Sequence, residues 1–224
     1  MISTTHIQAI SFDCYGTLTD FRIGETTAGL FNSRVQPDSM TAFLEDYTAY
    51  RFDEVLGEWQ PYPRVIQRAL ERTCARWRVA CDEADGAAIV EAIPTWGPHA
   101  DVPRPLAELA RHFPLVILSN AADSQIQSNV DKLGAPFEHV LTAEQAQAYK
   151  PRFQAFEHMF DTVGCGPEGF LHVSSSLRYD LISAHDLRIG ARVLVDRGHG
   201  PGIREYGYHE ITQLGELPAL LGLG

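Results

Sequence analysis

The stretch Ile7-Gln-Ala-Ile-Ser-Phe-Asp-Cys-Tyr-Gly-Thr-Leu18 lies near the start of the chain and decides the fold class. Its first half is a short apolar run, and a Tyr-Gly-Thr segment that favours a turn comes after it. A short apolar run that ends at a turn is typical of a buried β-strand. We therefore expect Asp13 to stand directly after a strand, with Tyr15 and Thr17 in the turn that follows.

Apolar runs of the same kind recur along the second half of the chain. They are Leu115–Ser119, Phe137–Leu141, Phe170–Val173 and Val193–Val195. Stretches with helical periodicity lie between or after them, at Pro105–His112, Ser124–Leu133, Arg152–Val163 and Leu177–Leu187. Strands that alternate with helices predict right-handed crossovers and a parallel sheet. In such a sheet, ligands bind beyond the carboxyl ends of the strands.

The segment from about residue 23 to residue 96 breaks this alternation. Helical patterns cover Met40–Leu56, Tyr62–Trp77 and Glu83–Ile93, and no strand pattern separates them. The sequence therefore predicts an α/β protein with two lobes. Residues 1–20 and 98–224 form a Rossmann-like parallel-sheet core, and residues 21–97 form an inserted α-helical cap.

Composition and charge restrict the partners of the chain. The net charge of −11 argues against a nucleic-acid partner, because phosphate binding requires a basic face. No apolar run approaches the roughly 20 residues of a membrane span, so we expect no membrane partner. No secretory signal is evident, and the four cysteines lack metal-binding spacing, which favours reduced thiols and a cytoplasmic location. The oligomeric state is left open, with a homodimer as the candidate.

The predicted strand ends carry an unusual set of polar groups. In chain order they are Asp13 and Thr17, Ser119 and Asn120, Lys150, and Ser175 with Asp180 shortly after it. A nearby ammonium keeps a carboxylate ionised, and a partly desolvated carboxylate can attack carbon or phosphorus to form a covalent ester. Hydroxyl and backbone N–H donors can orient a substrate carboxylate or phosphate. The convergence of these groups on one sheet edge predicts a catalytic site.

Each group has a plainer explanation when it is taken alone. An aspartate or a Ser-Asn pair after a strand often only caps a turn, and a serine run is usually a polar loop. Lys150, however, is one of only two lysines in a chain that has 16 arginines; the other is Lys132. The order of the groups, each at a strand end, is what favours the catalytic interpretation.

Four segments resemble the motifs of the haloacid dehalogenase superfamily. They are Phe12–Leu18, Leu118–Asn120, Tyr149–Pro151 and His172–Asp180. The resemblance spans nearly the whole chain. It implies a Rossmann-like core with an α-helical cap, with Asp13 as the nucleophile, Lys150 holding the carboxylates and Asp180 positioning a water.

Two positions indicate the subfamily within this resemblance. Phosphatases of the superfamily carry an aspartate as general acid where this chain has Tyr15, and a phenol is too weak an acid for that task near neutral pH. They also carry a Mg²⁺-binding carboxylate where this chain has Ser175. Both changes resemble the L-2-haloacid dehalogenases, which implies a small carboxylic-acid substrate and no cofactor. Because Asp13 and Asp180 are retained, a weak Mg²⁺ site at these two residues stays an alternative.

The resemblance implies a substrate-binding set made of Tyr15, Thr17, Ser119, Asn120, Ser175 and Arg51. Arg51 is included because the family's halide-accepting arginine falls near Glu45 in this chain, and Arg34 is the other candidate for that role. An asparagine expected three residues before Asp180 is Leu177, and a tyrosine expected six residues after Lys150 is Phe156.

Two rival functions remain at this stage. One is a Mg²⁺-dependent phosphatase or phosphonate hydrolase on the same fold, and the other is a catalytically idle relative that binds small molecules. The glycine-rich segment from Gly198 to Gly202 is interpreted as a turn, because Pro201 interrupts it and no evident helix follows.

Overall fold

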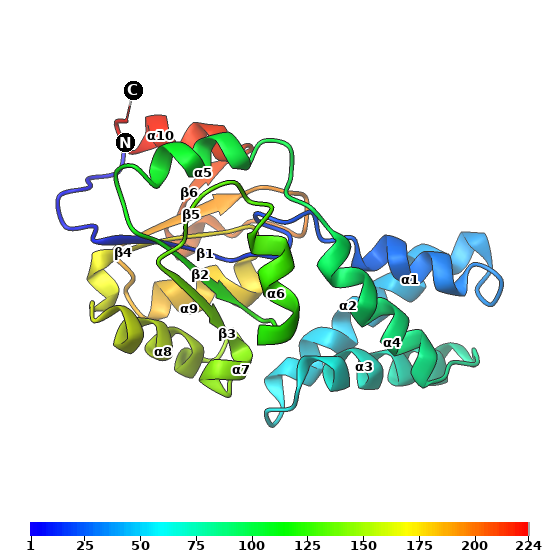
Figure 1. Cartoon of the computed structure of the whole chain (residues 1–224). Helices are drawn as coiled ribbons and strands as arrows, with labels where there is room; N and C mark the ends of the chain where they lie inside the picture. Colours follow the sequence, from blue (N-terminus) through cyan, green and yellow to red (C-terminus); the bar gives the residue numbers. More distant parts are fainter. Residues whose placement is uncertain (224) are drawn as a thin grey trace. The chain divides into compact units, whose positions relative to one another are not determined.

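A computed structural model describes residues 1–223 of the chain (Figure 1). The chain divides into two units. Unit 1 holds Met1–Asp20 and the chain from Gly97 onward, and unit 2 holds Phe21–Trp96.

Unit 1 is built on a six-stranded sheet in which every neighbouring pair is parallel. The strand order is β3-β2-β1-β4-β5-β6. The strands are β1 (Ala9–Phe12), β2 (Leu115–Ser119), β3 (His139–Thr142), β4 (Phe170–Ser174), β5 (Ala191–Val195) and β6 (His209–Ile211). This arrangement confirms the predicted α/β fold with a parallel sheet. The third predicted strand begins two residues later than expected, and β6 is a three-residue strand that the apolar pattern did not reveal.

Helices cover both faces of this sheet (Figure 1). The helices of unit 1 are α5 (Pro103–Leu109), α6 (Asp123–Val130), α7 (Ala143–Ala146), α8 (Phe153–Val163), α9 (Ile182–Asp186) and α10 (Leu217–Leu220). On one face Ile10, Phe12 and Leu171 pack with residues of α5, α6 and α10. On the other face Ala9 and Phe170 pack with residues of α8 and α9. Alternate residues of a strand point to opposite faces of a sheet. Because helices cover both faces, all four side chains of β1 are buried.

The helix predicted over Leu177–Leu187 has a different beginning from the one expected. Leu177–Leu181 forms a π-helical turn, and α9 continues from Ile182 to Asp186. The Ser176 hydroxyl accepts a hydrogen bond from the backbone N–H of Tyr179 at 3.1 Å and so caps this turn. A π-helical turn widens the helix by one residue and often occurs at functional sites. Here it carries Asp180.

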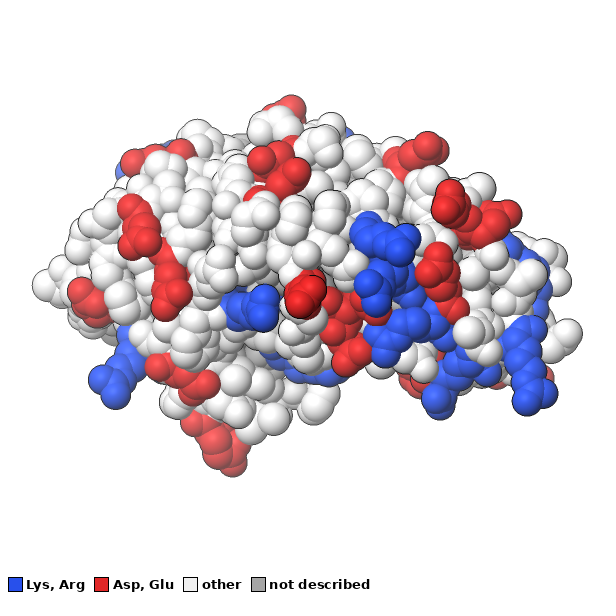
Figure 2. Space-filling view, turned by 90° about the horizontal axis from the view of Figure 1, so that it is seen from below, with Lys and Arg blue, Asp and Glu red and all other residues white. Residues whose placement is uncertain are grey.

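Unit 2 consists of the helices α1 (Ile23–Phe31), α2 (Met40–Leu56), α3 (Tyr62–Trp77) and α4 (Glu83–Ala92). α1 was not anticipated. The apolar side of α3 is buried, whereas its opposite side carries four arginines at every fourth position, Arg64, Arg68, Arg72 and Arg76. Arg72 forms ion pairs with Asp53 at 2.8 Å and Glu54 at 2.7 Å, and Arg76 pairs with Asp46 of the same helix α2 at 2.7 Å. Arg72 and Arg76 therefore join α3 to α2. Basic and acidic side chains are mixed on the right of Figure 2.

No helix within residues 1–223 is both long and apolar enough to cross a membrane.

Candidate active site

Asp13 stands where the direction of the strand order reverses. β1 lies between β2 and β4, and the chain adds β3 beyond β2 and β5 beyond β4. In parallel α/β sheets the crevice at such a switch point is where ligands bind. Phe12 is level with Ile117 of β2 and with Val173 of β4. The backbone N–H of Asp13 donates to the carbonyl of Val173 at 3.0 Å, which holds the first residue after β1 against the end of β4.

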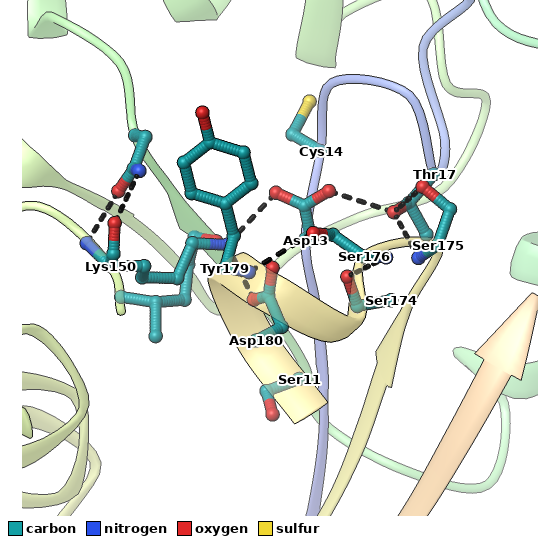
Figure 3. A network of polar contacts seen from close by, with 12 residues as sticks. Ser11, Asp13, Cys14, Thr17, Lys150, Ser174, Ser175, Ser176, Tyr179 and Asp180 are labelled. Carbon is teal, nitrogen blue, oxygen red and sulfur yellow. Dashed lines mark hydrogen bonds and ion pairs between the residues drawn. The ribbon is translucent and has the colours of Figure 1, made fainter. Parts of the chain in front are cut away.

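Lys150 connects Asp13 to Asp180. Its ammonium donates to Asp13 Oδ1 at 2.9 Å, to Asp180 Oδ1 at 2.7 Å and to the carbonyl of Leu118 at 2.8 Å. These three contacts use all three N–H groups of the ammonium. The Lys150 residue is 1% exposed. Figure 3 shows Lys150 on one side of Asp13, and Thr17 with Ser175 on the other.

Burial and charge act differently on the three groups. Burial lowers the pKa of Lys150, but Asp13 and Asp180 outweigh this effect and raise it, so the ammonium stays protonated. Burial raises the pKa of Asp180, but Lys150 and the hydrogen bond from His172 outweigh it and hold that pKa below its ordinary value. Burial raises the pKa of Asp13, and the negative charge of Asp180 raises it further. Lys150 lowers this pKa but offsets only part of the rise. Asp13 is therefore the more basic of the two carboxylates, as suits a nucleophile.

Thr17 and Ser175 support the second oxygen of Asp13. The Thr17 hydroxyl donates to Asp13 Oδ2 at 2.7 Å and accepts the backbone N–H of Ser175 at 2.8 Å. The Ser175 Oγ lies 3.1 Å from Thr17 Oγ1. Each carboxylate oxygen of Asp13 thus has one hydrogen-bond donor among these neighbours. Each oxygen also keeps a lone pair that can attack a substrate.

The other predicted site residues of unit 1 lie close by, but with different partners. The side-chain amide of Asn120 donates to the carbonyl of Lys150 at 2.9 Å, and its oxygen accepts the N–H of Lys150 at 2.7 Å. Asn120 therefore holds the backbone of Lys150. The Tyr15 hydroxyl donates to Asn129 at 2.8 Å, while the ring packs against the core. Ser119 is 1% exposed, and its hydroxyl has no hydrogen-bond partner within residues 1–223.

Arg51 belongs to α2 in unit 2, and its aromatic neighbours Tyr47 and Phe21 belong to the same unit. Arg51 is buried, and its guanidinium lies 5.1 Å from the ring centre of Tyr47 and 5.5 Å from that of Phe21. Arg34, the other candidate for the halide, forms an ion pair with Asp85 at 2.6 Å. The guanidinium of Arg34 therefore already has an anionic partner within unit 2.

Two histidines near Asp13 and Asp180 were not identified from the sequence. His172 of β4 lies 2.9 Å from Asp180 Oδ1 through its Nε2 atom. His199 belongs to the glycine-rich segment, and its Nδ1 atom lies 3.3 Å from Ser175 Oγ. Gly16 has φ +89°, and a Cβ atom there would lie 3.0 Å from the His199 ring. The glycine-rich segment bends at residues 198–200, and it places an imidazole beside the residues that follow Asp13. His172 stands two residues before a serine run, a pattern that gives no distinct sequence signal.

The groups around Asp13 fit an ammonium better than a bridging Mg²⁺. The Oδ1 atoms of Asp13 and Asp180 both accept hydrogen bonds from Lys150, so the cation between the two carboxylates is part of the chain. Ser175 adds a hydroxyl rather than a third carboxylate. Within residues 1–223 no cluster of three or more histidine, cysteine, aspartate or glutamate side chains is arranged to hold a metal ion.

Comparison with known proteins identifies related enzymes. Residues 7–187 match the family model of haloacid dehalogenase-like hydrolases. The chain is 29% identical over 174 residues to haloacetate dehalogenase H-2 of Moraxella sp. (strain B), covering 76% of this chain and 78% of that protein. It is 27% identical over 177 residues to (S)-2-haloacid dehalogenase of Pseudomonas sp. (strain YL), covering 76% of this chain and 75% of that protein.

A solved structure has the same fold over almost its whole length. The L-2-haloacid dehalogenase from Xanthobacter autotrophicus with chloropropionic acid covalently bound superposes with a TM-score of 0.78 at 21% identity. The match covers 96% of this chain and 98% of that chain.

Proposed function

Because the chain belongs to the haloacid dehalogenase-like hydrolases, we propose that it hydrolyses the carbon–halogen bond of a small 2-haloacid. The reaction proceeds through an ester on Asp13. The 2-haloacid dehalogenases among its relatives support this substrate class. The chloropropionic acid covalently bound in the structural relative supports a covalent mechanism.

The observation that carries the proposal is the buried ion cluster of Asp13, Lys150 and Asp180. A carboxylate that is held ionised by an ammonium and has a raised pKa is a competent nucleophile toward an sp³ carbon. Halide leaves as a stable anion and needs no proton, so a general acid is not required. The Tyr15 hydroxyl, which stands where a phosphatase has its acid, is bonded to Asn129.

The proposed reaction has two steps. In the first, a carboxylate oxygen of Asp13 attacks the carbon that bears the halogen, the carbon–halogen bond breaks, and halide leaves with its electron pair. In the second, a water oxygen attacks the carbonyl carbon of the Asp13 ester and gives a proton to Asp180. The bond between that carbonyl carbon and the substrate oxygen breaks, and the substrate oxygen takes up a proton, so the product leaves as a 2-hydroxy acid. The second proton of the water is released to solvent. One oxygen atom of Asp13 is thus exchanged for an oxygen of water.

Donors at the strand ends are proposed to hold the substrate carboxylate. The Ser119 hydroxyl is buried at the end of β2 and has no partner within residues 1–223. The Ser175 hydroxyl and its neighbour Thr17 lie on the side of Asp13 that faces away from Lys150. A monoanionic substrate can be held by hydroxyl and backbone donors of this kind without a divalent cation. A phosphoryl group would bring more negative charge toward Asp13, and Mg²⁺ normally offsets that repulsion.

The test is a comparison of substrates with and without a chelator. We expect one or both enantiomers of 2-chloropropionate to be hydrolysed at the same rate in EDTA as in Mg²⁺, and p-nitrophenyl phosphate to remain intact. Activity on the phosphate ester that EDTA abolishes and Mg²⁺ restores would instead identify a phosphatase. Inactivity toward haloacids, phosphate esters and carboxylic esters alike would identify an idle relative that only binds small molecules.

The covalent step is tested with Asp13→Asn, which keeps the shape of the side chain but removes the nucleophile. Turnover should fall by about 10⁴-fold or more. Asp131→Asn, an exposed position at the end of α6, is the matched control and should leave turnover unchanged. A single turnover of the wild type in ¹⁸O-water should place the label in the Asp13 carboxylate. Label that appears only in the product would overturn the ester mechanism.

Three further features of the proposal stay predictions. They are the role of Arg51 as halide acceptor, a homodimeric assembly and a cytoplasmic location.

A further inference from the structure

His172 is a polar residue in the middle of a central, buried strand. It belongs to β4 and lies level with Ser11 of β1 in the parallel register. Both residues are 0% exposed, and their strand neighbours Ala9 and Phe170 belong to the apolar cluster beneath α8 and α9. An imidazole at such a position is costly unless its nitrogens are hydrogen-bonded. Its retention in the sheet interior therefore requires a specific partner.

Both nitrogens of His172 have partners. Nδ1 lies 2.9 Å from Ser11 Oγ, and Nε2 lies 2.9 Å from Asp180 Oδ1. An ionised carboxylate oxygen can only accept, so Nε2 carries the proton of this hydrogen bond. In neutral His172 the Nδ1 atom then accepts the hydroxyl hydrogen of Ser11. The ring of Phe156 packs edge-on against the imidazole with ring centres 5.5 Å apart, a contact that involves neither imidazole hydrogen bond.

The two oxygens of Asp180 consequently differ. Oδ1 accepts from the Lys150 ammonium at 2.7 Å and from His172 at 2.9 Å. Oδ2 is buried and has no hydrogen-bond partner within residues 1–223. A carboxylate held by two donors on one oxygen cannot rotate to exchange its oxygens without breaking both hydrogen bonds. The oxygen that remains available to accept a proton is therefore always the same one.

We propose that His172 is a positioning residue for the second half of the reaction, holding Asp180 so that Oδ2 receives the proton of the attacking water. This inference rests on the proposed function, because it assigns a task to a residue of the same site. The water oxygen bonds to the carbonyl carbon of the Asp13 ester while its proton passes to Asp180 Oδ2. When the bond from that carbon to the substrate oxygen breaks, Oδ2 returns the proton to the departing alkoxide. The second proton of the water is left on the Asp13 carboxyl group and is released to solvent, after which Asp13 and Asp180 are both carboxylates again.

The assignment separates the two chemical steps. Formation of the ester needs the Asp13 nucleophile and Lys150, and within residues 1–223 neither of them is hydrogen-bonded to His172. Hydrolysis of the ester needs a correctly oriented Asp180. Loss of the hydrogen bond from His172 should therefore slow the second step and spare the first. A residue that served only the packing of the sheet would slow both steps together or lower the fraction of folded protein.

The experiment measures the two steps separately in His172→Leu and His172→Gln. With 2-chloropropionate in rapid-quench mixing, we expect His172→Leu to release a burst of about one halide per enzyme within threefold of the wild-type rate. Steady-state turnover should be at least thirtyfold slower, and intact-protein mass spectrometry should find most of the enzyme as the ester. His172→Gln keeps an N–H donor and should recover part of the hydrolysis rate. The matched control Phe156→Leu removes the ring contact but no hydrogen bond to Asp180, and should accumulate no ester.

A pH profile provides a second measurement that packing alone would not change. Asp180 faces Lys150, His172 and, beyond the ammonium, Asp13. The hydrogen bond from His172 contributes to the low pKa of Asp180. The acid limb of the hydrolysis step should therefore move to higher pH in His172→Leu, and Ser11→Ala, which leaves the imidazole in place, should move it less. This comparison remains available in Ser11→Ala and His172→Gln if His172→Leu does not fold.

The outcomes distinguish this inference from the proposed function. Slowing of the halide burst and of hydrolysis by the same factor in folded variants would overturn the role of His172 while leaving the dehalogenase reaction intact. Unchanged hydrolysis would do the same. Absence of halide release by the wild type would overturn the proposed function, and this inference with it.

Discussion

Replacement of Lys150 by methionine tests the charge balance of the site. Lys150→Met keeps most of the length of the side chain and removes the ammonium from a position that is 1% exposed. Asp13 and Asp180 then stay buried without the cation that lies 2.9 Å and 2.7 Å from their Oδ1 atoms. Removal of one partner from a buried ion pair typically costs about 3–5 kcal/mol, because it leaves an uncompensated charge.

The size and the pH dependence of this loss follow from the same contacts. In a protein of this length, about 3–5 kcal/mol corresponds to a fall in Tm of roughly 6–20 °C. Lys150 lowers the pKa of both carboxyl groups, so these pKa values rise in its absence. A carboxyl group with a pKa above its unfolded value destabilises the folded state at neutral pH, and this penalty disappears as the pH falls through the raised pKa. The difference between variant and wild type should therefore be largest near pH 7 and shrink toward pH 4.

Urea denaturation followed by circular dichroism at several pH values provides the assay. Lys132→Met, at an exposed position, is the matched control and should change the free energy of unfolding by less than about 0.5 kcal/mol. The double variant Lys150→Met with Asp180→Asn removes one of the two uncompensated carboxylate charges and should recover part of the lost free energy of unfolding. If Lys150→Met matched Lys132→Met at pH 7, or if its penalty grew as the pH fell, the ammonium would not be the charge that compensates these carboxylates.

Further substitutions and titrations test single contacts of the Asp13 loop. Thr17→Val removes the hydrogen bond to Asp13 Oδ2 and should lower kcat by about tenfold to a hundredfold, since a hydrogen bond to a charged group contributes about 1.5–3 kcal/mol; unchanged kcat would contradict this role. Gly16→Ala places a side chain at φ +89° and 3.0 Å from the His199 ring, so urea denaturation should find it about 1–2 kcal/mol less stable. Burial raises the pKa of Cys14 to about 12, so peptide mapping after iodoacetamide treatment at pH 8 should find this thiol unmodified in the native protein. Because burial raises the pKa of Asp13, the acid limb of kcat/KM should lie above the value of about 3.9 that is usual for aspartate, and a limb at or below that value would refute the raised pKa.

The sequence by itself determined the parallel α/β architecture and the residues at the strand ends. Short apolar runs and helical periods are local properties, and a strand buried on both faces must be apolar along its length whatever its neighbours are. Asp13 could be placed at the edge where the carboxyl ends of the parallel strands meet, and the scarcity of lysine singled out Lys150, which follows α7 rather than a strand. The ion pair between them at 2.9 Å agrees with that reasoning. Short elements such as β6 carry too few residues to show a period, and they form because a neighbouring strand offers hydrogen bonds.

The tertiary structure alone decided which polar atoms have partners. Asn120 and Tyr15 stand at strand ends like Ser119, yet Asn120 binds the backbone of Lys150 and Tyr15 binds Asn129. His172 is separated from Asp180 by eight positions, and only the π-helical turn that begins at Leu177 brings the carboxylate back over β4. Whether a hydrogen bond forms depends on differences of a few tenths of an ångström in the donor–acceptor distance, and the whole packed fold determines that distance. A sequence pattern specifies which face a residue occupies, but not which donor its side chain meets there.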